Sequence, residues 1–257
     1  MKIDLITVSR NNYEELFQTI ESIGVVLNNN SNDSSIGGLI VVDASTNTKN
    51  INNELLEFEK TFRIKTMLIQ EPDNGIYDGM NKGVKYSSNE FVQFINSGDK
   101  LINFISTQDL RRTINQKNVA GIATDVNLVF NKKTIKRKAR TICQSKGISM
   151  PAIHQGIVYK QHLLTKVPFS LNYKVCGDFD NICHLLSLNF QFLVINKTTA
   201  SLTVGGISTT KPFLLFSEST DIYKKYMLPR WWEVKLYRLR LLKSIILYQL
   251  LYQLNRI

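Results

Sequence analysis

Cysteine is scarce in this chain, which has three among 257 residues: Cys143, Cys176 and Cys183. The odd count and the absence of a Cys-x-x-Cys pair argue against a disulfide framework and against a cysteine-ligated zinc site. Reduced thiols are the simplest interpretation, and they fit a cytoplasmic protein.

Long hydrophobic runs are also missing. No segment offers the ~18 uninterrupted apolar residues that a transmembrane helix needs. The N-terminus, residues 1–8, has the pattern of a strand and lacks the apolar core and the cleavage site of a signal peptide. We therefore expect a cytoplasmic protein without a membrane-spanning helix.

Acidic residues are outnumbered by basic ones, 21 to 32, which leaves a formal net charge of +11. An excess of this size indicates an anionic partner, and nucleic acid, nucleotide phosphates and anionic lipid all meet that description. The sequence has no helix-turn-helix, RNP or zinc-finger signature. Nucleic-acid binding therefore rests on charge alone, and we do not expect it.

Strand and helix patterns alternate along the N-terminal part of the chain. Strands are predicted at residues 3–8, 39–42, 63–69 and 91–95, and helices at 13–23 and 51–62. This alternation predicts an α/β protein with a mostly parallel sheet flanked by helices. Polar residues follow the strands at Ser9, Asp43, Asp73 and Asp99, so we expect them to share one edge of the sheet.

The most specific pattern lies between residues 73 and 99. It begins with the turn signal Asp-Asn-Gly, continues as a short helix, and ends with a buried strand followed by Asn-Ser-Gly-Asp. Gly75, Gly79 and Gly83 are spaced by four and share one helical face. A helical glycine costs about 1 kcal/mol relative to alanine. The spacing therefore predicts that this face approaches a sheet or a ligand closely.

This stretch resembles the centre of family 2 glycosyltransferases of the GT-A fold, in the branch that assembles bacterial polysaccharides. That branch has a "GIYDAMNKG" helix before a strand that ends in "NSGD", and residues 75–83 and 96–99 match these motifs. The resemblance implies an inverting transferase that moves a sugar from a nucleotide diphosphate sugar, with uridine diphosphate preferred, to a lipid-diphosphate-linked glycan acceptor. The alternatives are an inactive nucleotide-binding or scaffold protein of the same fold and, with less support, a nucleic-acid-binding protein.

The resemblance also implies which residues bind the nucleotide sugar. They come from the strand ends and the motif helix: Thr7, Ser9, Arg10, Asp43, Asp73, Gly75, Asp78, Asn81, Lys82, Asn96, Ser97 and His154. Asp43 would accept a hydrogen bond from a pyrimidine N–H, although an aspartate after a strand is also an ordinary turn former. His154 is equally compatible with a structural histidine bonded to the backbone.

Metal binding is implied at the end of the fourth strand. Most of the superfamily has Asp-x-Asp there, whereas this chain has Asn96 and Gly98 at those two positions and its carboxylate at Asp99. The resemblance assigns Asp99 as the ligand of Mn²⁺ or Mg²⁺, with Asn96 as a neutral helper. Oxygen ligands suit both cations.

The second chemical motif is Cys176-Gly177-Asp178-Phe179-Asp180, directly before an apolar helix. Asp178 matches the carboxylate that the family places at a helix start as general base. A helix N-terminus favours the ionised carboxylate. Helix capping is the structural alternative for Asp178 and for Asp180.

Two basic segments remain. Residues 131–146 contain seven basic and no acidic residues, which indicates either a solvated surface loop or a contact with a phosphate-bearing acceptor. Residues 222–257 contain eight basic residues and one acidic residue, interleaved with tryptophan, leucine and isoleucine. We therefore predict a GT-A domain at residues 1–220 and a basic amphipathic helical tail at 221–257. The tail would lie on the anionic inner face of the cell membrane or pack against its own domain or a second copy, so self-association stays open.

Overall fold

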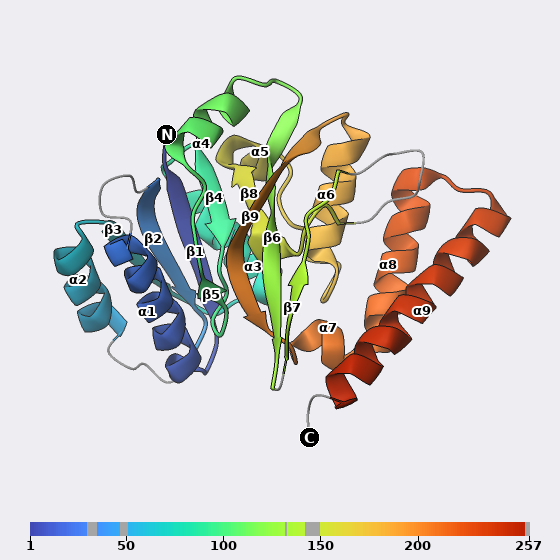
Figure 1. The fold of residues 1–257 in the computed structure, drawn as a ribbon, viewed down its shortest axis with the longest axis horizontal. Helices are drawn as coiled ribbons and strands as arrows, with labels where there is room; N and C mark the ends of the chain where they lie inside the picture. Colours follow the sequence, from blue (N-terminus) through green and yellow to red (C-terminus); the bar gives the residue numbers. More distant parts are fainter. Residues whose placement is uncertain (30–34, 47–50, 132, 142–149, 255–257) are drawn as a thin grey trace.

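The computed structural model describes residues 1–29, 35–46, 51–131, 133–141 and 150–254. Its N-terminal part alternates strands and helices, as the sequence predicts (Figure 1). The elements are β1 (Ile3–Ser9), α1 (Tyr13–Asn29), β2 (Ile36–Asp43), α2 (Ile51–Phe62), β3 (Lys65–Gln70), α3 (Ile76–Tyr86) and β4 (Phe91–Phe94).

The C-terminal part is more irregular. It comprises β5 (Lys100–Leu101), α4 (Thr107–Ile114), β6 (Val119–Phe130), β7 (Lys133–Arg137), η2 (His154–Gly156), β8 (Ile157–Lys160), α5 (Gln161–Lys166), α6 (Gly177–Ser187), β9 (Gln191–Thr203), α7 (Ile207–Thr210), α8 (Pro212–Met227) and α9 (Trp231–Leu254).

The strands form one sheet in the order β3-β2-β1-β4-β8-β6-β9-β5, with β7 paired to β6. The first four strands are parallel, and β6 and β9 are also parallel, whereas β8, β7 and β5 join the sheet as antiparallel strands. Parallel strands need cover on both faces. One apolar core lies under α1 and α2 and the other under α3 and α6.

The glycine face of α3 packs on β1. A Cβ atom at Gly79 would lie 2.7 Å from Val8 Cγ1, and one at Gly83 would collide with Ile6 Cγ2. The helix axis therefore lies closer to the sheet than a larger residue permits. Gly75 instead precedes the helix and has φ +118°, a conformation that glycine adopts readily. The predicted close approach to a sheet is confirmed at Gly79 and Gly83.

One basic segment is partly a strand. For residues 131–146 the sequence indicates a surface loop or an acceptor contact. Within this segment, Lys133–Arg137 form β7, which is antiparallel to β6. Four of the five β7 residues are exposed, so the strand lacks the apolar alternation by which a half-buried strand is recognised. The described residues do not include Lys132 or residues 142–149, and Cys143 lies in that second stretch. The other two thiols, Cys176 and Cys183, are free and buried.

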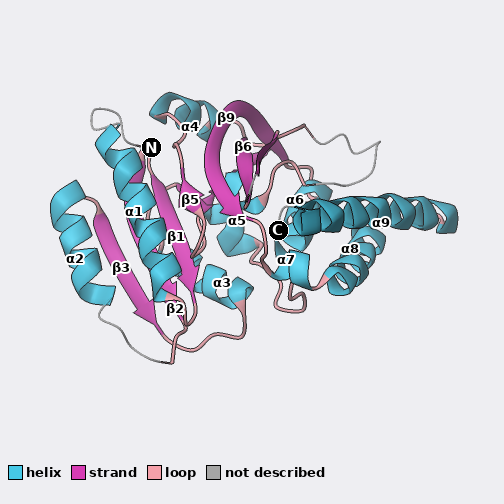
Figure 2. Cartoon of the chain, turned by 60° about the horizontal axis from the view of Figure 1, so that its bottom comes forward, coloured by secondary structure: helices cyan, strands magenta, loops and turns pink. Residues whose placement is uncertain are grey.

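The boundary expected between residues 220 and 221 falls inside α8. Ile222 and Tyr223 of that helix are buried, and Ile222 belongs to a small core that joins α8 to α6. The C-terminal half of α8 is thus part of the domain core. The segment that projects from the domain is α9, which lies beside α8 at the edge of the molecule (Figures 1 and 2).

The α9 helix is not amphipathic in the predicted sense, because it is apolar on two sides. One side packs against the domain: Tyr237 stacks on Tyr223 with ring centroids 4.1 Å apart, and Tyr248 contacts Phe130. The other side is exposed and carries Trp231, Trp232, Leu236, Leu239, Leu242, Ile246, Leu247, Leu250 and Leu254. At 3.6 residues per turn these exposed residues fall within about half of the helix circumference. Within the described part of the chain, no helix has both the length and the apolar character required to cross a membrane.

Candidate active site

Three side-chain oxygens at the carboxyl ends of β1 and β4 are buried and unpaired. Among the described residues, the hydroxyl oxygens of Thr7 and Ser9 and the amide oxygen of Asn96 find no hydrogen-bond partner. The Ser97 N–H donates to the Val8 carbonyl at 3.2 Å, so the two strands stay together beyond the end of β4. A buried polar atom without a partner costs about 1–3 kcal/mol. A polar ligand at this edge of the sheet would give these three atoms hydrogen-bond partners.

Asp43 lies beside Ser9 in the register of β1 and β2 and is almost fully buried. Its Oδ1 accepts a hydrogen bond from Ser45 Oγ at 2.6 Å, the local contact expected of a turn former. Among the described residues, its Oδ2 accepts only a long bond of 3.4 Å from Gln70 Nε2. Oδ2 therefore keeps the capacity to accept a hydrogen bond from a ligand.

The loop before α3 is held by its own carboxylates. Asp73 Oδ1 accepts from the Gly75 N–H at 3.1 Å and lies 3.8 Å from the exposed guanidinium of Arg10. The Asp78 carboxylate accepts from the Asn74 N–H at 2.9 Å and pairs with Lys82 at 3.4 Å. The structure thus brings Arg10, Asp73, Gly75, Asp78 and Lys82 together beside the end of β1.

Asn81 points elsewhere. Its amide donates to the Phe169 carbonyl and accepts from the Phe169 N–H, both at 2.9 Å. Both ends of the amide are used, so Asn81 fastens the segment before α6 to α3. This contact is structural and differs from the donor-binding role that the resemblance implies for Asn81.

Asp99 follows β4 and is partly exposed. Gln155 Nε2 donates to its Oδ2 at 2.7 Å, and Thr19 Oγ1 donates to its main-chain carbonyl at 2.8 Å. Burial of the carboxyl group raises the pKa of Asp99 to about 7; the Gln155 bond opposes this rise, and the charge of Glu15 adds to it. A carboxylate in such surroundings gains from a nearby cation.

The donor set around Asp99 fits a cation that is shared with a ligand. Asn96 contributes an unpaired amide oxygen, and Asp99 a carboxylate whose ionised form is destabilised. The described residues contain no cluster of three or more metal-ligating His, Cys, Asp or Glu side chains. Mg²⁺ and similar ions are commonly held by one or two carboxylates together with substrate phosphates and water. The residues fit a divalent cation that is completed by a diphosphate.

Asp178 lies in the first turn of α6 and is partly exposed. Its Oδ1 accepts hydrogen bonds from the Phe179 N–H at 2.9 Å and from the Tyr77 hydroxyl at 3.1 Å. In the described part of the chain no group donates to its Oδ2. Asp180, two residues later, is 4% exposed and pairs with Lys225 of α8 at 2.9 Å. Asp178 thus keeps one carboxylate oxygen that can contact a ligand, whereas Asp180 forms a structural ion pair with Lys225.

His154 is buried and follows Ile153 at the start of η2. Its ring stacks on Phe94 with centroids 5.0 Å apart, Nδ1 is 3.4 Å from the Tyr159 hydroxyl, and Nε2 has no partner among the described residues. Burial lowers the pKa of His154, and the negative charge of Asp178 opposes that decrease. The adjacent Gln155 contacts Asp99. His154 is therefore a buried neutral imidazole within the site, and its backbone links the surroundings of Asp99 and Asp178.

Three residues of the site are absent from the sequence prediction. Gln155 contacts Asp99, Tyr77 contacts Asp178, and Glu218 of α8 binds the backbone before α6. Tyr77 lies within the motif helix, where its spacing from other apolar residues indicates a core position. Glu218 is 42 residues from Cys176, whose N–H it binds, and no local pattern signals a contact across such a separation.

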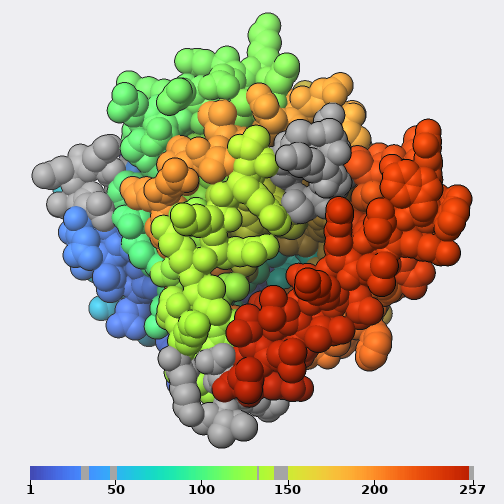
Figure 3. All heavy atoms as spheres, turned by 45° about the vertical axis from the view of Figure 1, so that its right-hand side comes forward, coloured from blue at the N-terminus to red at the C-terminus, as the bar shows by residue number. Residues whose placement is uncertain are grey.

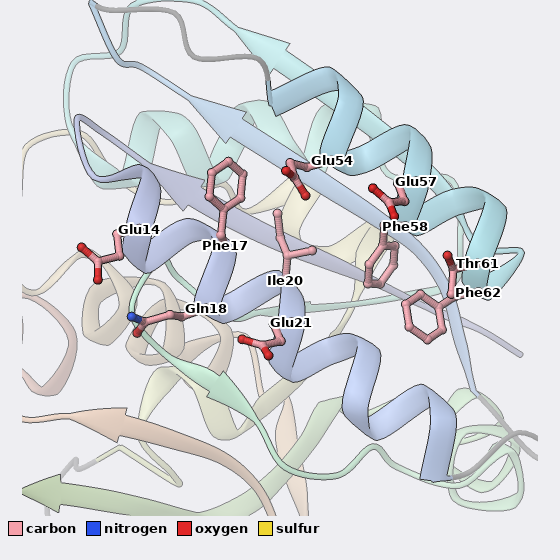
Figure 4. Close-up of a pocket in the computed structure, with 10 residues that line it drawn as sticks. All are labelled: Glu14, Phe17, Gln18, Ile20, Glu21, Glu54, Glu57, Phe58, Thr61 and Phe62. Atoms are coloured by element: carbon pink, nitrogen blue, oxygen red, sulfur yellow. The ribbon is translucent and has the colours of Figure 1, made fainter.

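The surface beside the site is hollowed. Figure 3 shows a hollow between the β6–β7 hairpin and the helices α8 and α9, with teal atoms of the α3 segment at its floor. A second groove, of about 460 Å³, lies between α1 and α2 (Figure 4). Its lining residues are Glu14, Phe17, Gln18, Ile20, Glu21, Glu54, Glu57, Phe58, Thr61 and Phe62, none of which is a predicted site residue.

No protein-family model matches the sequence, and no curated protein is significantly similar to it. Solved structures resemble the fold. Staphylococcus aureus TarS 1-349 in complex with UDP is 16% identical, with a TM-score of 0.65 over 96% of this chain and 71% of that chain. The mannosyltransferase PcManGT from Pyrobaculum calidifontis, in complex with GDP-Man and Mn²⁺, is 12% identical, with a TM-score of 0.61 over 89% of this chain and 65% of that chain.

The longer TarS structure is 17% identical, with a TM-score of 0.61; the match covers 86% of this chain and 39% of that one, so this chain corresponds to well under half of that protein. These neighbours are glycosyltransferases of the GT-A fold, and the fold class expected from the sequence is confirmed. At such identities the likeness establishes the fold alone, because one fold carries many activities.

Proposed function

We propose that the protein is an inverting glycosyltransferase that takes a nucleotide diphosphate sugar as donor. The observation that carries the proposal is the grouping at one sheet edge of three buried, unpaired oxygens, those of Thr7, Ser9 and Asn96, with Asp99 in the turn that follows Asn96. Asp178, a partly exposed carboxylate of α6, is close enough for its charge to act on His154. Ligands of open α/β sheets bind outside the carboxyl ends of the strands.

A uridine diphosphate sugar is the preferred donor. Asp43 would accept from the base through Oδ2, and Thr7 and Ser9 would bond to the nucleoside. Structures of similar fold hold UDP, UDP-GlcNAc or GDP-Man, which supports a nucleotide sugar and leaves the choice of base to experiment. The donor side is completed by further residues that the resemblance to family 2 transferases implies: Arg10, Asp73, Gly75, Asp78, Lys82 and Ser97.

The diphosphate would lie beside Asp99. Asp99 and Asn96 would hold a divalent cation, Mn²⁺ or Mg²⁺, together with the donor phosphates. Such a cation neutralises the charge that develops on the departing diphosphate. Mn²⁺ in the PcManGT structure supports this assignment. The buried His154 would donate or accept one further hydrogen bond through Nε2.

Asp178 would act as general base. The acceptor hydroxyl oxygen attacks the anomeric carbon, its proton passes to Asp178 Oδ2, and the bond from the anomeric carbon to the diphosphate oxygen breaks with its electron pair. Attack opposite the leaving group inverts the anomeric configuration. The contacts of Oδ1 with Tyr77 and Phe179 leave Oδ2 as the oxygen that can face the acceptor.

The acceptor would be a glycan on a lipid diphosphate, in the synthesis of a bacterial surface polysaccharide. Two features of the elements that border the hollow support an anionic, membrane-bound acceptor. Strand β7 carries Lys133, Lys136 and Arg137, and α9 combines basic residues with an exposed apolar face. The protein would accordingly lie on the inner face of the cell membrane, attached through α9.

Calorimetry with uridine and guanosine diphosphates, each with Mn²⁺ and with EDTA, tests the proposal. We expect binding of one nucleoside diphosphate that is much tighter with Mn²⁺, followed by release of that nucleoside diphosphate when the matching donor and an acceptor are supplied. Tight binding without any transfer identifies an inactive nucleotide-binding protein. Metal-independent binding of RNA, with no affinity for either diphosphate, contradicts the proposal.

A further inference from the structure

A buried carboxylate of α8 binds the backbone that leads into α6. Glu218 is 8% exposed, and its two oxygens accept hydrogen bonds from three consecutive N–H groups, those of Lys174, Val175 and Cys176, each at 2.9 Å. Bonds from N–H groups to a carboxylate are about twice as strong as neutral ones. The turn at residues 174–176 is therefore fixed by a side chain that is distant in sequence.

This turn is linked to Asp178 through Tyr77. The Tyr77 hydroxyl lies 2.7 Å from the Val175 carbonyl and 3.1 Å from Asp178 Oδ1. The tyrosine ring packs against Gly177, where a Cβ atom would lie 2.7 Å from the ring. A hydroxyl group has one proton to donate, so Tyr77 donates to one of these two oxygens at a time.

We infer that Glu218 and Tyr77 are positioning residues for Asp178, an inference that rests on the proposed role of Asp178 as general base. Glu218 fixes the position of the Val175 carbonyl and of the start of α6. The Tyr77 hydroxyl bonds to that carbonyl and to Asp178 in the first turn of α6. With Asp178 ionised, the Tyr77 proton is donated to Oδ1. Once Oδ2 has taken the acceptor proton, rotation of the hydroxyl turns the same proton to the Val175 carbonyl. No bond is formed or broken at Tyr77.

The chain offers a matched control for this inference. Lys225 also joins α8 to α6, through its ion pair with Asp180, yet it touches neither the turn nor Tyr77 in the described contacts. Lys225 is half exposed but Asp180 is buried, so Lys225→Met leaves a buried carboxylate without its partner, at a cost in stability. Lys225→Met therefore loosens the same helix pair without disturbing the proposed base.

The experiment compares Glu218→Gln with Lys225→Met in full-length protein. Glutamine keeps the size of the side chain but replaces one oxygen with an NH₂ group, which cannot accept from an N–H. Small displacements of a catalytic group can reduce turnover by up to about 10²-fold, so we expect kcat of Glu218→Gln to fall by roughly 10- to 100-fold. The KM for the donor and the calorimetric affinity for the nucleotide should stay unchanged, and Lys225→Met should keep near-normal kcat.

Tyr77→Phe provides a second variant that does not depend on the folding of Glu218→Gln. It keeps the ring against Gly177 and removes only the hydroxyl. We expect lower kcat at unchanged donor KM, and a double variant no worse than the more impaired single one, because residues that act through one group are not additive. Normal kcat in Glu218→Gln or Tyr77→Phe, or an equal loss in Lys225→Met, overturns the inference. If Asp178→Asn itself keeps full turnover, the proposed base is wrong, which is a separate outcome.

Discussion

Asp178 and Asp180 occupy the first turn of the same helix but lie in different environments. They are two residues apart, so their side chains leave the helix in widely different directions. Asp180 is buried and paired with Lys225, whereas Asp178 is partly exposed and bonded to Tyr77. A general base needs access to its substrate. The surroundings, rather than residue type, select Asp178 as the candidate base.

Asp99→Asn tests the cation site. If Asp99 holds a divalent cation, this variant should lose transfer activity and bind the nucleoside diphosphate more weakly in Mn²⁺, because a neutral amide is a poorer ligand for a hard cation. In EDTA its nucleotide affinity should match that of the wild type. Calorimetry under both conditions measures the difference, and equal losses in Mn²⁺ and EDTA contradict the role of Asp99.

The strand-end residues of the site were predictable from the sequence, but their partners were not. Ser9 and Asn96 follow apolar runs whose parallel arrangement places their ends together, whereas Thr7 is named by the family resemblance alone. Glu218 is different, because its contact with residues 174–176 depends on how α8 returns to the domain. Asn81 is a different case: the motif suggests ligand binding, and the structure shows its amide bonded to the backbone of Phe169.

At the scale of elements, the glycine spacing of α3 sets how closely the helix approaches β1. Replacing Gly83 with alanine places a Cβ atom in collision with the buried Ile6. Overpacking costs about 1–3 kcal/mol, which exceeds the ~1 kcal/mol gained by removing a helical glycine. We expect a net loss of unfolding free energy in urea denaturation. Gly206→Ala is the control: a Cβ atom there meets nothing within 4 Å, and a loss as large as that of Gly83→Ala contradicts the explanation.

A second element-scale prediction concerns the β6–β7 hairpin. Burial alone would raise the pKa of Asp125, but the bonds from Lys136 Nζ and the Ala139 N–H lower it below its ordinary value. An unfolded aspartate has a pKa of about 4. Because the pKa of folded Asp125 is lower, ionised Asp125 stabilises the fold above about pH 4. This contribution is lost as the pH falls through the folded pKa. Asp125→Asn should therefore cost roughly 1–3 kcal/mol at pH 7.

Urea denaturation of wild type and Asp125→Asn at several pH values checks this. The difference between their free energies of unfolding should shrink as the pH is lowered below about 4. A difference that stays constant down to low pH shows that the ionised form of Asp125 contributes nothing to stability.

Elements with clear hydrophobic periodicity were predicted well, and those without it were not. Helix α2 spans the predicted residues 51–62, and β1, β2 and β4 lie where their apolar runs indicate. Strand β7 was missed because its lysines and arginine give no apolar alternation. In α9 the sequence indicates one apolar face of tryptophan, leucine and isoleucine, and the structure adds a second apolar side, where Tyr237 and Tyr248 pack against the domain.

At the scale of the whole molecule, α8 and α9 have separate roles. The α8 helix belongs to the core through Ile222 and holds the start of α6 through Glu218. The α9 helix has no fully buried residue and presents tryptophans and leucines to solvent. It also borders the hollow in Figure 3. Attachment of α9 to a membrane would place that hollow beside the bilayer.

Truncation after Leu228 tests the proposed membrane contact. The removed residues carry Arg230, Lys235, Arg238, Arg240, Lys243 and Arg256, and each basic residue contributes about 1 kcal/mol near an anionic surface. The truncated protein should stay folded, keep activity on a water-soluble acceptor, and no longer sediment with anionic vesicles. High salt should release the full-length protein only partly, because insertion of Trp231 and Trp232 is not screened.

Truncation after Ser219 serves as the contrasting case. It removes Ile222 and Lys225 from α8, so we expect loss of the folded state by circular dichroism and thermal melting. If removal of α9 alone unfolds the domain, or leaves vesicle binding intact, the membrane assignment is wrong.

The most direct test of the proposed glycosyl transfer is the turnover of Asp178→Asn beside that of Asp180→Asn, with the matching donor and acceptor. Loss of a general base reduces the rate by roughly 10²–10⁴-fold, so Asp178→Asn should lose that much kcat while its nucleotide affinity stays unchanged. Asp180→Asn should lose stability through its broken pair with Lys225 and keep most of its turnover. Near-normal turnover in Asp178→Asn, or the larger loss in Asp180→Asn, would contradict the proposed mechanism.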